Sequence, residues 1–170
     1  RSDIPEIAVR ITSKGFEYRE GKSPSNTVIR GYGRVRLLAG ANEEVSDPGR
    51  LIRLDNLFDP RAPLCNVEHW LLGLHAEYPE AFRIAATTIK DVLPDEQIGD
   101  LKPTEDRQGI EIHMQGNPYS LQELSAGYQS VISLAADIMS GIPPNKMRDL
   151  REVPGTVLLD EIGTQLHPRW

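Results

Sequence analysis

A single short run near the end of the chain restricts the fold more than any other feature. Residues 156–159 read Thr-Val-Leu-Leu, and Asp160 and Glu161 follow at once. A strand with one face in water alternates apolar and polar side chains, whereas consecutive apolar residues place apolar groups on both faces. The run therefore predicts a buried parallel strand of an α/β fold. Because ligands bind at the carboxyl ends of such strands, the two acids are the first candidates for a functional site.

Two adjacent carboxylates at a strand end have a specific chemical use. Asp160 can hold a hydrated Mg²⁺, and Glu161 beside it can polarise a water molecule for attack on a phosphate. The same pattern is also compatible with a strand that simply ends in two solvated carboxylates. The run alone does not separate these two interpretations.

The second candidate is the segment 124–129, Leu-Ser-Ala-Gly-Tyr-Gln, at the start of a predicted helix. Apolar residues recur behind it at helical spacing as far as Met139. Ser125 can cap the helix, and Gly127 lets a phosphate approach the backbone, where free N–H groups and the helix dipole favour an anion. The alternative is an ordinary capped helix whose apolar face belongs to the core.

Taken together, these two segments resemble the motifs of the ATP-binding-cassette (ABC) ATPases. Residues 125–127 match the core of the signature motif, L-S-x-G, and residues 156–161 match the Walker B strand with its catalytic glutamate. Residues 162–170 resemble the loop after Walker B in the RecF- and SMC-like heads, also called AAA family ATPases. That branch includes phage-defence ATPases of the Septu and retron-associated kind.

The resemblance extends upstream and also shows two departures. Three further segments look like parts that lie between the lobes of those heads: Gly31-Tyr-Gly33, Leu57-Phe-Asp59 and Glu68-His-Trp-Leu71. In the loop after Walker B, Gly163 stands where this branch usually has an acid, and Gln165 stands where it often has a histidine.

The resemblance implies a fold and a composite site. The fold would be the C-terminal part of an ABC-type head, an α/β structure with a β-rich N-terminal segment and an inserted helical pair. ATP and Mg²⁺ would be the cofactors, with Asp160 binding Mg²⁺ through water and Glu161 as the catalytic residue. The remaining site residues fall into two groups, those that contact ATP on the opposite subunit (Ser125, Ala126, Gly127 and Gln129) and those in the loop after Walker B (Gly163 and His167).

The resemblance also implies partners. ATP would hold two heads together as a homodimer, and hydrolysis would release them and switch an effector protein such as a nuclease, in anti-phage defence or DNA transactions. Nucleic-acid binding stays open, and no membrane partner is expected. The alternative is a non-catalytic assembly module in which nucleotide only bridges the subunits, while a transporter subunit fits the final Leu-His-Pro-Arg-Trp less well.

The phosphate-binding P-loop, G-x-x-x-x-G-K-[ST], is not found in the chain. Gly21-Lys-Ser23 comes nearest, but Phe16 occupies the position of the first glycine, and Pro24 follows where a helix should begin. Both ends of the chain look cut. We therefore expect a P-loop before Arg1 and a switch histidine after Trp170, and we expect the 170-residue chain alone to be inactive.

Composition adds few limits. Lys plus Arg number 19 and Asp plus Glu 25, so the net charge of −6 gives no support for nucleic-acid or membrane attraction, although one basic face suffices to bind a nucleic acid. No apolar run approaches the roughly 18 residues needed to span a bilayer. The single cysteine, Cys65, excludes an intrachain disulfide and fits a reducing, cytoplasmic compartment.

We expect residues 1–170 to form one partial ABC-type domain in three segments. These are a β-rich segment (1–38), an inserted helical region with a connecting strand (39–118), and the signature helix, Walker B strand and following loop (119–170). Within them, periodicity and turn residues predict a hairpin of 7–12 with 16–19, a strand run in 27–38, helices at 67–78 and 79–93, a polar connection at 94–109 and a strand at 109–114.

Other polar residues carry weaker signals. Three histidines show no metal-ligand spacing with one another or with the cysteine: His69, His75 and His113. Three arginines flank the Gly-Tyr-Gly segment and could contact phosphate or nucleic acid, but a solvated strand face is the simpler interpretation: Arg30, Arg34 and Arg36.

Overall fold

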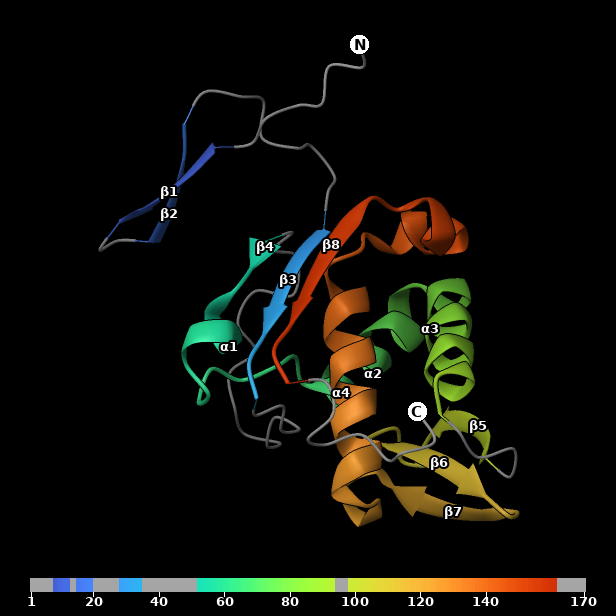
Figure 1. Cartoon of the computed structure of the whole chain (residues 1–170). Coiled ribbons are helices and arrows are strands. Elements are labelled where there is room, and N and C mark those ends of the chain that lie inside the picture. The colour runs from blue at the N-terminus through green and yellow to red at the C-terminus, as the bar shows by residue number, and fades with distance from the viewer. Residues whose placement is uncertain (1–7, 13–14, 20–27, 35–51, 94–97, 162–170) are drawn as a thin grey trace.

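The computed structural model describes residues 8–12, 15–19, 28–34, 52–93 and 98–161. It shows helices together with parallel and antiparallel sheets, which confirms the α/β class (Figure 1). Five sequence features discussed above lie outside the described residues: Gly21–Ser23, Arg36, Gly163, Gln165 and His167.

The N-terminal hairpin forms as the sequence predicts. Strands β1 (Ala8–Thr12) and β2 (Gly15–Arg19) pair antiparallel, with Thr12 opposite Gly15.

The strand that ends in the acid pair belongs to a three-stranded sheet of order β4-β3-β8. Strand β3 (Val28–Tyr32) lies in the middle, between β4 (Ile52–Arg53) and β8 (Gly155–Leu159). Both pairs are parallel, so the carboxyl ends of β3 and β8 meet at the same edge of the sheet.

Two glycines let a short helix approach the sheet closely. Helix α1 (Asp55–Phe58) follows β4 and packs on β3. A Cβ at Gly31 would lie 2.7 Å from a methyl group of Leu54, and a Cβ at Gly33 would lie 2.6 Å from the carbonyl oxygen of Asn56. The Gly-Tyr-Gly segment is therefore required for packing, because any side chain at either glycine would push α1 away.

Strand β8 is parallel, as predicted, but it is not buried. Val157 and Leu158 are neighbours in the strand, so their side chains point to opposite faces, and they are 41% and 45% exposed. Within the described ranges β8 forms one edge of its sheet, with β3 as its only strand neighbour. The expected burial is wrong here because the described part of the chain does not supply the cover that such an apolar strand needs.

A helical pair follows the parallel sheet's first strands. Helix α2 (Val67–Glu77) begins where the sequence predicts, because the Asn66 side-chain oxygen accepts a hydrogen bond from the His69 backbone N–H at 3.0 Å. Helix α3 (Pro79–Asp91) begins with its proline, which the first turn of a helix tolerates. The buried faces of the two helices share small and aliphatic side chains: Leu71, Leu74, Ala81, Ala85 and Ile89.

A second sheet is antiparallel and has the order β5-β6-β7. Strand β6 (Ile110–Met114) was predicted, whereas β5 (Ile98–Pro103) replaces part of the predicted polar connection, and β7 (Asn117–Ser120) continues after a turn. The sequence hides β5 because Ile98 and Leu101 are its buried residues, with a glycine and an acid between them.

Helix α4 (Ala126–Ser140) is the centre of the described structure. It follows the 3₁₀ turn η1 (Leu121–Glu123) and leads into the 3₁₀ segment η2 (Pro144–Glu152). Figure 1 shows α4 between the parallel sheet and the helices α2 and α3, and the core lies around it. Among the helices of the described ranges, none is long and apolar enough to cross a membrane.

Candidate functional site

The acid pair lies at the carboxyl end of β8. Asp160 and Glu161 are both exposed. The backbone N–H of Asp160 donates to the carbonyl oxygen of Tyr32 at 2.9 Å, which extends the pairing of β8 with β3 by one residue. Glu161 has a φ of 48°, in the left-handed region that few residues other than glycine adopt, and its Oε2 lies 3.1 Å from Nε of Arg34. The strand end therefore presents two carboxylates and one guanidinium to solvent.

This strand end fits a hydrated magnesium ion better than a fully protein-bound metal. Among the described residues no three His, Cys, Asp or Glu side chains are grouped closely enough to hold a metal ion. Mg²⁺ usually keeps several waters and takes one or two carboxylates together with substrate phosphates. Asp160, exposed beside Glu161, can supply such a carboxylate.

Ser125 is the N-cap residue of α4, but its hydroxyl makes no capping hydrogen bond. The expectation that Ser125 caps the helix is confirmed for its position and wrong for its side chain. Ser125 and Ala126 are exposed, and Gly127 is half-buried in the first turn. The first turn of a helix carries backbone N–H groups without partners inside the helix, together with the positive end of the dipole. This end of α4 can therefore accept an anion.

The segment before α4 is braced by side chains rather than by Ser125. The Ser120 hydroxyl and backbone N–H both donate to the Glu123 carboxylate, at 2.9 and 2.7 Å, and these bonds lower the pKa of Glu123. The Gln129 side-chain amide donates to the carbonyl oxygens of Gln122 and Leu124, both at 2.9 Å. In this structure the Gln129 amide thus holds the turn that precedes the helix.

The acid pair and the start of α4 occupy different places at the same side of the molecule. In Figure 1 strand β8 runs downward and α4 runs upward, so the carboxyl end of the strand and the amino end of the helix both point to the lower side of the view. The helix start lies beyond the strand end, next to the antiparallel sheet. The structure therefore brings Asp160 and Glu161 together and leaves Ser125–Gly127 apart from them.

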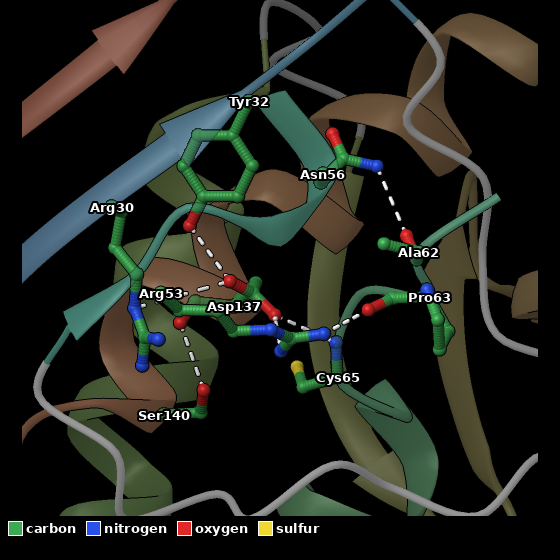
Figure 2. A network of polar contacts seen from close by, with 9 residues as sticks. All are labelled: Arg30, Tyr32, Arg53, Asn56, Ala62, Pro63, Cys65, Asp137 and Ser140. Carbon is green, nitrogen blue, oxygen red and sulfur yellow. Dashed lines mark hydrogen bonds and ion pairs between the residues drawn. The ribbon is translucent and has the colours of Figure 1, made fainter. Parts of the chain in front are cut away.

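A buried carboxylate connects the two elements that carry these candidates. Asp137 lies in α4 and is 0% exposed. The Tyr32 hydroxyl donates to its Oδ2 at 2.8 Å, while Arg53 Nη1 and the Cys65 backbone N–H donate to its Oδ1 at 2.6 and 2.7 Å. Figure 2 shows these groups converging on the one side chain. Asp137 thus joins α4 to β3, β4 and the segment before α2.

Burial changes the acid–base behaviour of two groups in this network. Burial, with the Asp137 charge as a second cause, raises the pKa of Tyr32 far above its usual value. Burial also raises the pKa of the Cys65 thiol to about 12, again helped by the Asp137 charge. Both groups stay protonated near neutral pH, so the Tyr32 hydroxyl remains a hydrogen-bond donor.

Arg30 overturns the expectation of a solvated arginine face. It is 1% exposed, with its Nε 3.9 Å from Oδ2 of Asp137. Within the described part of the chain, its Nε and Nη1 have no hydrogen-bond partner. Gly141, at the end of α4, makes room for this guanidinium, because a Cβ there would overlap it. The arginine points inward because alternate residues of β3 face α4, whereas Arg34, beyond the strand, is exposed.

Sequence reasoning missed this network, although one signal was available. Asp137 is an acid on a helix whose neighbours are apolar, between Ala136 and Ile138. A carboxylate in such a position needs partners to be buried. Its partners could not be named from the sequence because Tyr32 lies 105 residues away and Arg53 lies 84 residues away.

The three histidines His69, His75 and His113 lie in three different environments. His69 is exposed, the ring of His75 packs edge-on against Phe82 with 4.9 Å between ring centroids, and His113 Nε2 lies 2.8 Å from Glu111 Oε1.

Comparison with known proteins gives one informative result. An alignment of 169 positions that covers 96% of the chain shows 37% identity to the Septu protein PtuA of Bacillus mycoides strain KBAB4. The chain covers 22% of that relative, so it spans about a fifth of the relative's length. No protein-family model matches the chain. The similarity supports the Septu branch of the motif resemblance, and the ABC-type head stays a prediction.

Proposed function

We propose that this chain is part of an ABC-type ATPase head that pairs with a second head when ATP binds and switches an effector in anti-phage defence. The observation that carries the proposal is the exposed acid pair, Asp160 and Glu161, at the carboxyl end of a parallel strand. The similarity to the Septu protein PtuA supports the setting in defence.

In this head the acid pair carries the chemistry. Asp160 would hold a hydrated Mg²⁺, which would supply positive charge beside the phosphates. Glu161 orients or deprotonates the water that attacks the γ-phosphate. Arg34 pairs with Glu161 at 3.1 Å and reduces the repulsion between the two neighbouring carboxylates.

The start of α4 serves the other subunit. Ser125, Ala126 and Gly127 face the ATP held by the second head, and the helix dipole favours the triphosphate charge. The Ser125 hydroxyl suits this role because it makes no capping bond in its own helix. Gln129 supports the same contact by holding the preceding turn. Two such contacts form in a pair of heads with two-fold symmetry.

The catalytic role is tested with Glu161→Gln in the full-length protein. We expect ATP-dependent pairing, measured by light scattering, to persist while turnover falls by about two to three orders of magnitude, as for loss of a general base. Glu152→Gln, another exposed glutamate outside the site, is the matched control and should keep full turnover. Unchanged turnover in Glu161→Gln contradicts the assigned role.

The role of the helix start is tested with Ser125→Arg. We expect this variant to bind ATP in calorimetry but not to pair, whereas Gln108→Arg, which adds the same charge at an exposed turn, should pair normally. Pairing that survives Ser125→Arg contradicts the signature assignment. A wild-type protein that pairs on ATP without any turnover would instead be the non-catalytic assembly module.

A further inference from the structure

We propose that Tyr32 is a positioning residue of this ATPase site, because it joins the acid-bearing end of β8 to the helix that carries Ser125–Gly127. The inference rests on the proposed function and names a residue that acts through its neighbours. Tyr32 is the last residue of β3 and is 1% exposed.

Tyr32 contacts both parts of the site with two different groups. Its backbone carbonyl oxygen accepts the N–H of Asp160 at 2.9 Å. Its side-chain hydroxyl donates to Oδ2 of Asp137 at 2.8 Å, as Figure 2 shows. One residue thus forms a short path from the proposed magnesium ligand to the last turn of α4.

The helix end of this path is held rigidly. Both carboxylate oxygens of Asp137 are hydrogen-bonded, with Arg53 and the Cys65 backbone on Oδ1 and Tyr32 on Oδ2. Asp137 lies twelve positions after Ser125, which at 1.5 Å per residue is about 18 Å along a straight helix. Holding Asp137 therefore restrains α4 at a point about 18 Å from its amino end.

The strand end of the path is held from its other side as well. The N–H of Gly33 lies 3.2 Å from the carbonyl oxygen and 3.1 Å from the side-chain oxygen of Asn56 in α1. The backbone that follows Tyr32 is therefore held by α1, the Tyr32 hydroxyl is bonded to α4, and a shift of Tyr32 would disturb its backbone bond to Asp160. Tyr32 is thus the residue that connects the backbone of the acid-bearing strand end directly to α4.

The test is Tyr32→Phe in the full-length protein, which removes the hydroxyl and keeps the ring. Turnover per folded molecule should fall by roughly tenfold, because a small displacement of a positioned group slows the reaction. The Mg²⁺ concentration for half-maximal turnover should rise, because Asp160 is held less firmly. ATP binding should not change.

The matched control is Ser140→Ala. Ser140 donates its hydroxyl to the backbone carbonyl of Asp137 at 2.8 Å, so the variant removes a buried hydroxyl beside the same residue without touching β3. A purely structural role for Tyr32 predicts that both variants lower the melting temperature and leave the Mg²⁺ requirement of the folded protein unchanged. That result overturns the positioning role.

A second measurement needs no variant and covers the case in which Tyr32→Phe does not fold. In the wild-type protein, amide hydrogen exchange should slow at Asp160 and along α4 together when ATP and Mg²⁺ are added. If protection from exchange rises only at Asp160, or only along α4, the proposal is overturned. If Glu161→Gln keeps its turnover, both proposals fall; if only Tyr32→Phe behaves like Ser140→Ala, the positioning role alone falls.

Discussion

Two arginine–carboxylate pairs are made of the same chemical groups, but one pair is buried and the other is exposed. Arg53 and Asp137 lie 2.6 Å apart with side chains 7% and 0% exposed, whereas Arg34 and Glu161 lie 3.1 Å apart and are 68% and 45% exposed. The first pair is enclosed by further hydrogen bonds with β3 and with the segment before α2, and the second stands in solvent. The buried pair holds the fold, and the exposed pair is accessible to a substrate.

The difference follows from the cost of removing charge from water. A buried carboxylate is stable only while its partners remain, so taking one partner away leaves an uncompensated charge. An exposed pair is solvated already, and each group keeps most of its free energy without the other. The molecule therefore fixes its framework at Asp137 and leaves Glu161 able to exchange partners.

The largest effect is expected on the buried side of this comparison. Arg53→Ala should lower the free energy of unfolding by about 3–5 kcal/mol, because it leaves Asp137 with one fewer donor inside the protein. Urea unfolding followed by circular dichroism measures the loss. Arg83→Ala, which breaks an exposed pair with Glu80, is the control. A loss below that of the control contradicts the structural role of the buried pair.

The next largest effect is expected in β8, whose apolar side chains are exposed. Val157→Thr with Leu158→Thr should destabilise the full-length protein by about 1–3 kcal/mol, since apolar residues on both faces of a parallel strand are normally covered. In the 170-residue chain alone, the same change should shift stability by less than about 0.5 kcal/mol, because the side chains are already half exposed. Equal shifts in the two proteins show that nothing covers β8.

A smaller effect is expected at the exposed pair. Arg34→Ala should change the free energy of unfolding by less than about 1 kcal/mol, since both partners stay solvated. The difference should shrink further in high salt, which screens exposed charges. Thermal unfolding at two salt concentrations measures this, and a loss comparable to that of Arg53→Ala removes the contrast between the pairs.

The smallest effect is expected at Glu123, whose carboxylate accepts two bonds from Ser120. These bonds lower the pKa of Glu123, so the stability they add is present above the ordinary glutamate pKa and is lost as the pH falls through the lowered value. Glu123→Gln should therefore melt slightly below wild type at neutral pH and together with it in acid. If the difference in melting temperature between the two proteins grows in acid, the predicted direction of this pH dependence is wrong.

Features with local signals were predictable. Asn66 caps α2, and Pro79 separates α2 from α3, because capping bonds and the fixed proline backbone act within one turn. The hairpin and β6 followed from alternation. At the site, the positions of Ser125 and of the acid pair at a parallel strand end came from motif and periodicity, while the roles of these residues stay predictions.

Features that depend on distant partners were not predictable. The burial of Arg30 depends on the packing of β3 against α4, whose Asp137 is 107 positions later in the chain and lies 3.9 Å from the Arg30 Nε. The exposure of β8 could not be predicted from its composition. An apolar run indicates that a strand is normally packed against other elements, but it does not indicate which part of the protein packs there. Strand β5 was missed because two buried residues in six are too few for a periodic signal.

The room at Gly141 has a consequence for how this chain can change over evolutionary time. Its missing side chain admits the Arg30 guanidinium, so the two positions share one volume although they belong to different elements. A relative that gains a methyl group at 141 has to shorten residue 30 in compensation, and one that loses the arginine is released from keeping glycine. These two sites are expected to vary as a linked pair.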